Sequence, residues 1–189
     1  MRTFVAIEIG DEVKDSIQHL RDRLDRADAD VRWVRREHTH LTLKFIGEID
    51  EARTGEIEQA LARAAGSVEP FDIRITDVGT FPRRRPTVLW VGIEDESRAL
   101  GELHRAVDDA LGEQGIEKAG RKFTAHITLG RIRSGRNIRK LLDILQAETG
   151  TEFGTVRVKS LTLFASTLTP DGPIHTPLAT AALGKYKPT

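Results

Sequence analysis

A four-residue word, His-x-Thr-Leu, occurs twice in this chain, once in each half. It reads "HLTL" at residues 40–43 and "HITL" at residues 126–129. His126 follows His40 by 86 residues, and the same offset aligns four further pairs: Phe4 with Trp90, Val5 with Val91, Ile7 with Ile93 and Glu8 with Glu94. A period of this length is too long for a solenoid repeat. We therefore interpret the chain as an internal duplication of a β-α-β-α-β unit.

The expected secondary structure follows the same order in both halves. Runs rich in β-forming residues predict strands at 3–9, 40–46, 71–78, 87–93, 123–129, 154–166 and 175–183. Helical spacing predicts helices at 51–65, 97–113 and 136–147, and one that begins at Gly10-Asp11 and carries Val13, Ile17, Leu20 and Leu24. Pro177 predicts an edge position for the last strand, because proline cannot donate to a central ladder. The pattern predicts two lobes, related by a pseudo-two-fold axis, that present the same motif strand to a shared groove.

The size and composition of the chain restrict its functional class. With 189 residues we expect one bilobal domain spanning 1–189, with sequence halves of roughly 1–80 and 87–189. Lys plus Arg (29) equals Asp plus Glu (29), which argues against bulk, non-specific binding of nucleic acid. The chain has no cysteine, no signal-like N-terminal segment, and no stretch approaching the roughly 20 apolar residues of a membrane span. We expect a cytoplasmic protein without membrane contact, whose contacts with nucleic acid are local.

The two motifs point to acid-base chemistry at a phosphate. Side chains at i and i+2 of a strand share a face, so each motif sets an imidazole beside a Thr hydroxyl. Two histidines that flank a phosphorus atom can divide the work: a neutral imidazole accepts a proton from the attacking oxygen, and an imidazolium protonates the leaving oxygen. Thr hydroxyls can donate hydrogen bonds to the non-bridging oxygens. A ribose 2′,3′-cyclic phosphate fits this arrangement, because in-line attack needs a base on one side and an acid on the other.

Two other interpretations of the motifs remain open at this point. A His-x-Thr pair in a strand is often a packing feature, although two copies at equivalent places make independent accidents less plausible. His38 and His40 lie on one strand face and could bind a divalent ion together with His126. The metal interpretation lacks a carboxylate at a suitable spacing and does not explain the threonines.

The stretches around the motifs resemble one known family. They are "RTFVAIEI" at the N-terminus, Trp33 before the first motif, "LKFIGEI" after it, "FPRRRPTVLWVGI" in the middle and "GRI" after the second motif. Together with "HLTL" and "HITL" they resemble the 2H phosphoesterases, most closely the RNA 2′,3′-cyclic phosphodiesterase branch also called 2′-5′ RNA ligase. The resemblance covers essentially the whole chain.

The resemblance implies a fold, a reaction and residue roles. The implied fold is bilobal α+β, with two antiparallel-rich sheets flanking a central groove and helices outside. The implied reaction is hydrolysis of an RNA 2′,3′-cyclic phosphate end to a 2′-phosphomonoester without metal or other cofactor, with 2′-5′ joining as its reverse. His40 would protonate the departing 3′ oxygen, His126 would activate water, and Thr42 and Thr128 would hold the phosphate oxygens. The implied partner is such an RNA end or a related nucleotide, and no obligate protein partner is indicated.

Two cationic residues near the motifs are further candidates for contacting the substrate. Lys44, four residues after His40, falls on the groove face of an undisturbed strand, so it is a candidate for an RNA phosphate or a rim lysine. Arg131, five residues after His126, falls on the opposite face unless a bulge at Gly130 re-aims it toward the phosphate.

The remaining candidates have both a functional and a structural interpretation. Arg83, Arg84 and Arg85, between two prolines, are either a clamp for the RNA backbone or a solvated loop. Trp33, Phe45 and Phe123 could stack on a base or belong to the core. His175 stands where relatives often have a tyrosine after the Gly-Pro pair, either as a stacking residue or as a surface histidine. The alternative function is a non-catalytic protein that binds a nucleotide or RNA end in the same groove.

Overall fold

The computed structural model describes residues 1–82, 84–120, 122–170 and 172–184, and nine strands and four α-helices lie within them. The strands are β1 (Arg2–Glu8), β2 (Val31–Trp33), β3 (His40–Glu48), β4 (Phe71–Phe81), β5 (Val88–Glu94), β6 (His126–Ile132), β7 (Glu152–Val158), β8 (Ser160–Thr169) and β9 (Gly172–Ala182). The helices are α1 (Asp11–Asp25), α2 (Thr54–Gly66), α3 (Ala99–Glu113) and α4 (Ile138–Ala147), and two 3-10 turns are η1 (Arg36–His38) and η2 (Glu51–Arg53). The duplication is visible in these bounds, because β1 shifted by 86 residues coincides with β5.

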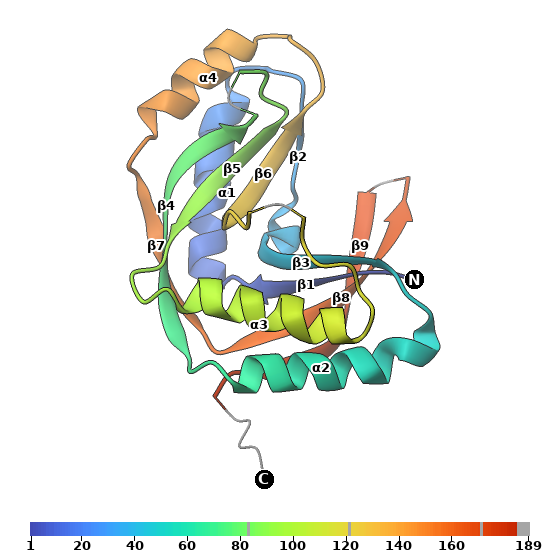
Figure 1. The fold of residues 1–189 in the computed structure, drawn as a ribbon. Coiled ribbons are helices and arrows are strands. Elements are labelled where there is room, and N and C mark those ends of the chain that lie inside the picture. Colours follow the sequence, from blue (N-terminus) through green and yellow to red (C-terminus); the bar gives the residue numbers. More distant parts are fainter. Residues whose placement is uncertain (83, 121, 171, 185–189) are drawn as a thin grey trace.

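All strands belong to one curled antiparallel sheet in the order β7-β4-β5-β6-β3-β1-β8-β9, with β2 paired to β6 (Figure 1). We call β3, β1, β8 and β9 the His40 lobe, and β6, β5, β4 and β7 the His126 lobe. The two lobes meet at β3 and β6, where the recorded register is a single pair, Leu41 opposite Ile127. The expected α+β, bilobal, antiparallel fold is confirmed, although its two sheets are halves of one continuous sheet.

The lobes do not coincide with the two halves of the sequence. Strand β4 comes from the first half but pairs with β5 and β7, whereas β8 comes from the second half and pairs with β1. The helices are exchanged too: α1 packs against β7 and α4, and α3 packs against β3 and α2. The single strand predicted at 154–166 is wrong for the same reason, because it is divided at Lys159 into β7 and β8, which lie in different lobes. Each lobe is therefore completed by elements of both halves.

The helices form where the sequence predicts them because each carries an apolar stripe that the sheet buries. In α1 the stripe is Val13, Ile17, Leu20 and Leu24, and in α3 it is Leu100, Leu103, Val107 and Leu111, all buried. Asp95 stabilises the start of α3, since its Oδ2 accepts a hydrogen bond from the Leu100 N–H at 2.7 Å. Apart from β2, which was not expected, and the divided strand, every predicted element lies within three residues of its expected ends.

The apolar residues of both motifs point into the helix-covered core. Leu41, Leu43, Ile127 and Leu129 are all buried there. Because neighbouring residues of a strand point to opposite faces, the His and Thr of each motif lie on the other face of the sheet. We call that face, which the helices do not cover, the inner face.

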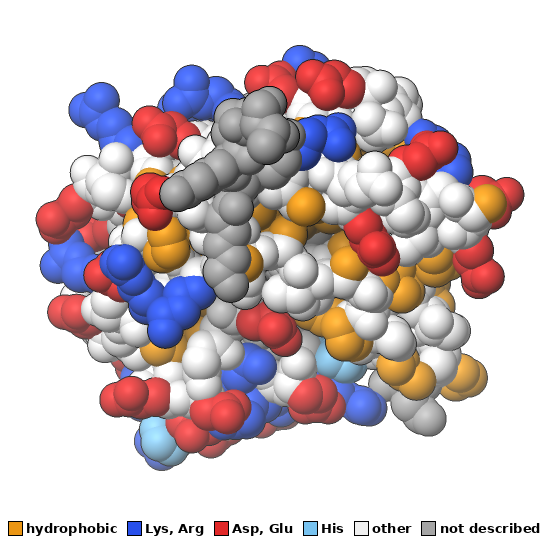
Figure 2. All heavy atoms as spheres, turned by 90° about the horizontal axis from the view of Figure 1, so that it is seen from below, with side chains coloured by type: hydrophobic (Ala, Val, Ile, Leu, Met, Phe, Trp, Pro, Cys, Tyr) orange, Lys and Arg blue, Asp and Glu red, His pale blue; other side chains and the backbone are white. Residues whose placement is uncertain are grey.

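The outer surface shows no concentration of one charge where α2 and α3 lie. Seen from below (Figure 2), Lys and Arg side chains are interspersed with Asp and Glu over this face. Among the described residues, none of the helices combines the length and the apolar character that crossing a membrane requires.

Candidate active site

The junction between the lobes brings the two copies of the motif side by side. The second residues of the two motifs, Leu41 and Ile127, are directly paired in antiparallel register. Extended by one residue in each direction, this register sets the His of each motif opposite the Thr of the other, on the inner face. In an ideal antiparallel pair the diagonal positions lie roughly 7–8 Å apart, a span that leaves room for one phosphate between the two imidazoles. The four side chains are those of His40, Thr42, His126 and Thr128.

Each of the two histidine rings has a hydrogen-bond partner in its own backbone, two residues earlier. The Nδ1 of His126 lies 2.7 Å from the carbonyl oxygen of Thr124, two residues earlier. His40 hydrogen-bonds the backbone of His38, also two residues earlier. Since a carbonyl only accepts, Nδ1 of His126 carries the proton, and Nε2 of the neutral ring keeps its lone pair. The duplication has thus preserved this backbone contact as well as the residue types.

The ring of His40 packs against aromatic side chains of its own lobe. It stacks on Phe4 with centroids 5.0 Å apart and an interplanar angle of 27°, and lies 6.4 Å from Phe164. His175 meets it edge-on at 5.4 Å. Burial lowers the pKa of His40 to about 4, and the positive charges that His175 and His38 can carry act in the same direction. His40 is therefore neutral in the ligand-free protein near pH 7.

The ring of His126 has different neighbours. Phe81 meets it edge-on at 5.2 Å and also contacts Trp90, the duplication partner of Phe4, at 5.1 Å. The indole of Trp90 lies so close over Gly79 and Gly92 that a Cβ at Gly79 would overlap the six-membered ring. The glycines therefore allow the strand backbone to approach the indole that supports this side of the site.

Lys44 is not on the inner face, so its expected placement beside His40 is wrong. The register of β1 with β3 shifts between the pairs Ala6–Thr42 and Val5–Lys44, which leaves Leu43 as the extra residue of a β-bulge. Lys44 consequently faces the helices, where its side chain is 6% exposed. Its Nζ donates to Asp108 Oδ1 at 2.5 Å and to the carbonyl oxygen of Glu117 at 2.6 Å. This lysine holds α3 and the following loop against the sheet.

The bulge that displaces Lys44 also places Phe45 on the inner face. Phe45 is opposite Phe4, with ring centroids 6.2 Å apart, and it is 71% exposed. The other two aromatic candidates lie elsewhere. Trp33 packs against the main core and donates its indole N–H to Asp25, and Phe123 stacks on His104 at 4.0 Å. Of the three, Phe45 is the one with a ring available to a base at the site.

Arg131 lies on the inner face because of a second bulge. The register of β5 with β6 passes from Trp90–Thr128 to Leu89–Gly130, so Leu129 is the extra residue. Arg131 is then opposite Val88, which shares the face of Trp90 and Thr128. The side chain of Arg131 is exposed. A bulge beside Gly130 thus turns Arg131 to the inner face, and contact with a phosphate remains a proposal.

The arginine cluster follows the strand that reaches His126. Arg84 and Arg85 are exposed in the connection from β4 to β5, close after Phe81 in the chain. Arg83 lies outside the described residues. The exposed position of the two described arginines is compatible with both interpretations of this segment.

The metal interpretation has no ligand set in the described part of the chain. No group of three His, Cys, Asp or Glu side chains there is placed to hold a metal ion, so His38, His40 and His126 do not form one. His38 instead contacts His175, with ring centroids 4.6 Å apart.

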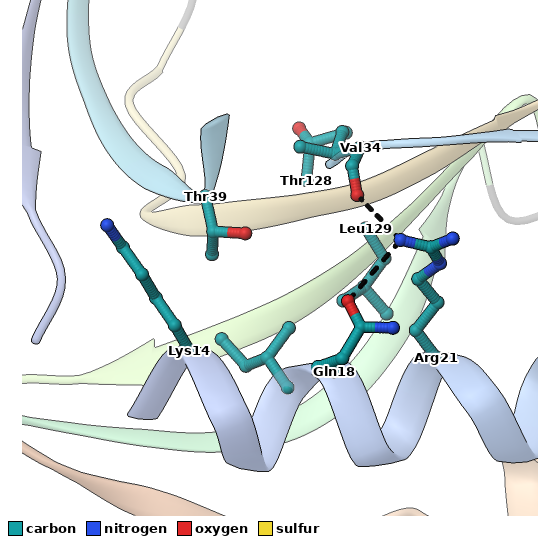
Figure 3. Close-up of a pocket in the computed structure, with 8 residues that line it drawn as sticks. Lys14, Gln18, Arg21, Val34, Thr39, Thr128 and Leu129 are labelled. Atoms are coloured by element: carbon teal, nitrogen blue, oxygen red, sulfur yellow. Dashed lines mark hydrogen bonds between the residues drawn. The ribbon is translucent and has the colours of Figure 1, made fainter. Parts of the chain in front are cut away.

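A pocket beside the motif strands contains cationic residues of α1 that the sequence analysis did not single out. Figure 3 shows Lys14 at one end of this pocket and Arg21 at the other, with Thr39 and Thr128 across from the helix. Arg21 donates to the Val34 carbonyl oxygen at 3.5 Å. Lys14 is half-buried, forms no ion pair within the described residues, and adds to the positive charge that lowers the pKa of His40. Lys14 follows Val13 of the apolar stripe of α1, and the sequence pattern of a helix does not indicate that such a lysine lies near the motif strands.

Comparison with known proteins supports the resemblance seen in the sequence. The family described as LigT like Phosphoesterase matches the chain twice, over residues 7–90 and 91–175, in agreement with the duplication. An RNA 2′,3′-cyclic phosphodiesterase of Methanothermobacter thermautotrophicus is 34% identical over 177 residues, which cover 93% of this chain and 95% of that protein.

Two solved structures have the same fold over nearly the whole chain. TT0787 of Thermus thermophilus superposes with a TM-score of 0.77 at 28% identity, covering 97% of this chain and 98% of that chain. Escherichia coli LigT complexed with 3′-AMP superposes with a TM-score of 0.74 at 29% identity, covering 96% of this chain and 97% of that chain. The chain therefore belongs to the LigT like phosphoesterase family.

Proposed function

We propose that this protein hydrolyses the 2′,3′-cyclic phosphate at an RNA end to a 2′-phosphomonoester, without a metal ion, by acid-base catalysis between His40 and His126. The observation that carries the proposal is the antiparallel register that sets the His of each motif opposite the Thr of the other on one open sheet face. The name of the archaeal relative and the 3′-AMP bound to the E. coli relative support the substrate class.

The proposed reaction uses the two histidines on opposite sides of the phosphorus. His126 accepts the proton of the attacking water at Nε2, which is free because Nδ1 donates to the Thr124 carbonyl oxygen. The bond from phosphorus to the 3′ oxygen breaks as the water oxygen bonds to phosphorus, and His40 gives its proton to the departing oxygen. The hydroxyls of Thr42 and Thr128 donate to the non-bridging oxygens, where charge accumulates. The site ends with His126 protonated and His40 neutral.

The same residues support a joining reaction, in which another nucleophile takes the place of water. A cyclic phosphate attacked by an RNA 5′ hydroxyl instead of water yields a 2′-5′ bond, with the proton transfers unchanged. Phe45 offers an exposed ring on which a base can stack, worth about 1–3 kcal/mol. Arg131 and the exposed Arg84 and Arg85 are the cations we assign to RNA phosphates.

The test is hydrolysis of an oligonucleotide that ends in a 2′,3′-cyclic phosphate, measured in excess EDTA. We expect full activity in EDTA and a loss of about 10²-fold or more in His40→Ala and in His126→Ala. His19→Ala, in an exposed position of α1, is the matched control and should keep the wild-type rate. Loss of activity in EDTA would point to a metal enzyme, and binding without turnover in the wild type would establish the alternative, a non-catalytic RNA-end binding protein.

A further inference from the structure

His175 brings a third imidazole to the site, from the edge strand of the His40 lobe. Its ring is 5.4 Å from His40 at 68°, 4.6 Å from His38 at 37°, and 4.9 Å from Phe4 at 70°. Its backbone is paired with Ser166 of β8, so the strand fixes its position. Three imidazoles from β3, η1 and β9 thus form one contiguous group.

Neighbouring imidazoles restrict each other's protonation. Two unit charges about 5 Å apart repel strongly unless water screens them, and His40 is only partly exposed. The other ionisable groups around His40 do not offset this repulsion fully: Lys14 of α1 adds positive charge, and Glu8, opposite His40 on β1, is an exposed carboxylate. Burial, followed by the charge that His38 can carry, also lowers the pKa of His175.

We propose that His175 is a positioning residue that acts through His40, adding to the burial that keeps this imidazole neutral until a phosphate anion enters the site. The negative charge of the bound anion offsets the repulsion, and His40 then takes up one proton from solvent. In the proposed reaction this is the proton that passes to the departing 3′ oxygen. The inference rests on the proposed function for the use of that proton, but the coupling between His175 and His40 does not depend on turnover.

The direct test measures the pKa of His40 by NMR titration of its ring nitrogens, assigned by comparison with His40→Gln. His175→Tyr keeps an aromatic ring against Phe4 and His38 but removes the charge. We expect the pKa of His40 to rise by about one unit in this variant, from the strength of a like charge at this distance. His19→Tyr is the matched control, and it should leave the pKa of His40 unchanged.

The second measurement repeats the titration with saturating sulfate, a tetrahedral dianion that does not titrate in this range. We expect sulfate to raise the pKa of His40 in the wild type and to raise it less in His175→Tyr, where less repulsion remains to be offset. His175→Gln serves as a second uncharged variant if the tyrosine disturbs folding. A pKa of His40 that changes by less than about 0.3 units in both variants would overturn the inference, because a His175 with only a structural role would leave that pKa unchanged.

Kinetics separates this inference from the proposed function. The pH profile of kcat/KM reports the ionisable groups of the free enzyme, so the limb of this profile that His40 sets should move to higher pH in His175→Tyr by the same amount as the pKa of His40. A shifted NMR titration without any turnover of the cyclic phosphate would leave the coupling standing and defeat the proposed function. Turnover of the cyclic phosphate with an unshifted titration of His40 and an unshifted pH profile would defeat the coupling and leave the proposed function standing.

Discussion

Replacing Lys44 with methionine should destabilise the protein without slowing the reaction of the folded molecules. Lys44 is 6% exposed and its partner Asp108 15%, and the ammonium also donates to the carbonyl oxygen of Glu117. Methionine keeps an unbranched apolar stem of similar length, so packing changes little while the cation is lost. Asp108 is then left largely buried beside an unpaired carbonyl.

The size of the effect follows from this geometry. Removing one partner of a buried ion pair typically costs about 3–5 kcal/mol. Asp108 keeps part of its solvation and the hydrogen bond from the Ala119 N–H at 3.1 Å. We therefore expect a loss of about 2–3 kcal/mol in the free energy of unfolding, which lowers the urea midpoint by about 1 M.

The loss should depend on pH in a defined direction. Burial acts to raise the pKa of Asp108, but the hydrogen bonds from Lys44 and the Ala119 N–H hold it below its ordinary value. A carboxyl whose pKa is lowered on folding stabilises the protein above its unfolded pKa of about 3.9, and that contribution is lost as the pH falls through the folded pKa. The difference between wild type and Lys44→Met should thus be constant near neutral pH and shrink below about pH 4.

Urea unfolding and the cyclic phosphate assay, measured on the same samples, test the reasoning. The double variant Lys44→Met/Asp108→Leu should be more stable than the sum of the single changes, because an apolar pair leaves no buried charge unpaired. If Lys44→Met keeps its stability within about 0.5 kcal/mol and loses tenfold or more in kcat/KM, Lys44 contacts the substrate and the placement by the bulge is refuted.

Two further changes test the supports of the site. Gly79→Ala should cost about 1–3 kcal/mol and lower kcat/KM, because the added Cβ displaces the indole of Trp90, whereas Gly101→Ala, with open space in α3, should stabilise by up to about 1 kcal/mol. If Gly79→Ala and Gly101→Ala changed the free energy of unfolding equally, the close approach of the Trp90 indole to Gly79 would be contradicted. Thr42→Val and Thr128→Val should each lower kcat by about 10–100-fold with little change in stability, and an unchanged kcat would remove that hydroxyl from the phosphate site.

Local pattern predicted the elements and the side-chain alternation within each motif well, because both depend on residues near one another in the chain. The stripe in α1 and the His-x-Thr alternation carry their own signal. The exchange of β4 and β8 between the lobes gives no signal in the local sequence pattern. Periodicity says which face of a strand is buried but not which strand lies beside it. The sequence therefore predicted two lobes but not their composition.

The two β-bulges show the same limit of local sequence pattern within single strands. Gly130 marked the bulge that turns Arg131 to the inner face, because glycine in a strand often accompanies one. The bulge at Leu43 has no such marker, and strict alternation placed Lys44 on the wrong face. Asp108, the partner that explains Lys44, is 64 residues away and could be found only from the fold.

A duplication tends to place two histidines in identical surroundings, yet dividing the roles of acid and base between them requires that their surroundings differ. Each ring has a hydrogen-bond partner in the backbone two residues earlier, so this feature does not distinguish them. Their aromatic contacts differ, because His40 stacks on Phe4 whereas His126 meets Phe81 edge-on. The outer strands differ as well. In the His40 lobe β9 follows β8 to its end and brings His175 to the ring, whereas in the His126 lobe β7 pairs with β4 only from Phe71 to Thr76 and stops before Phe81. The longer outer strand adds a titratable neighbour to His40, and we infer that this difference in strand length helps to separate the two proposed roles.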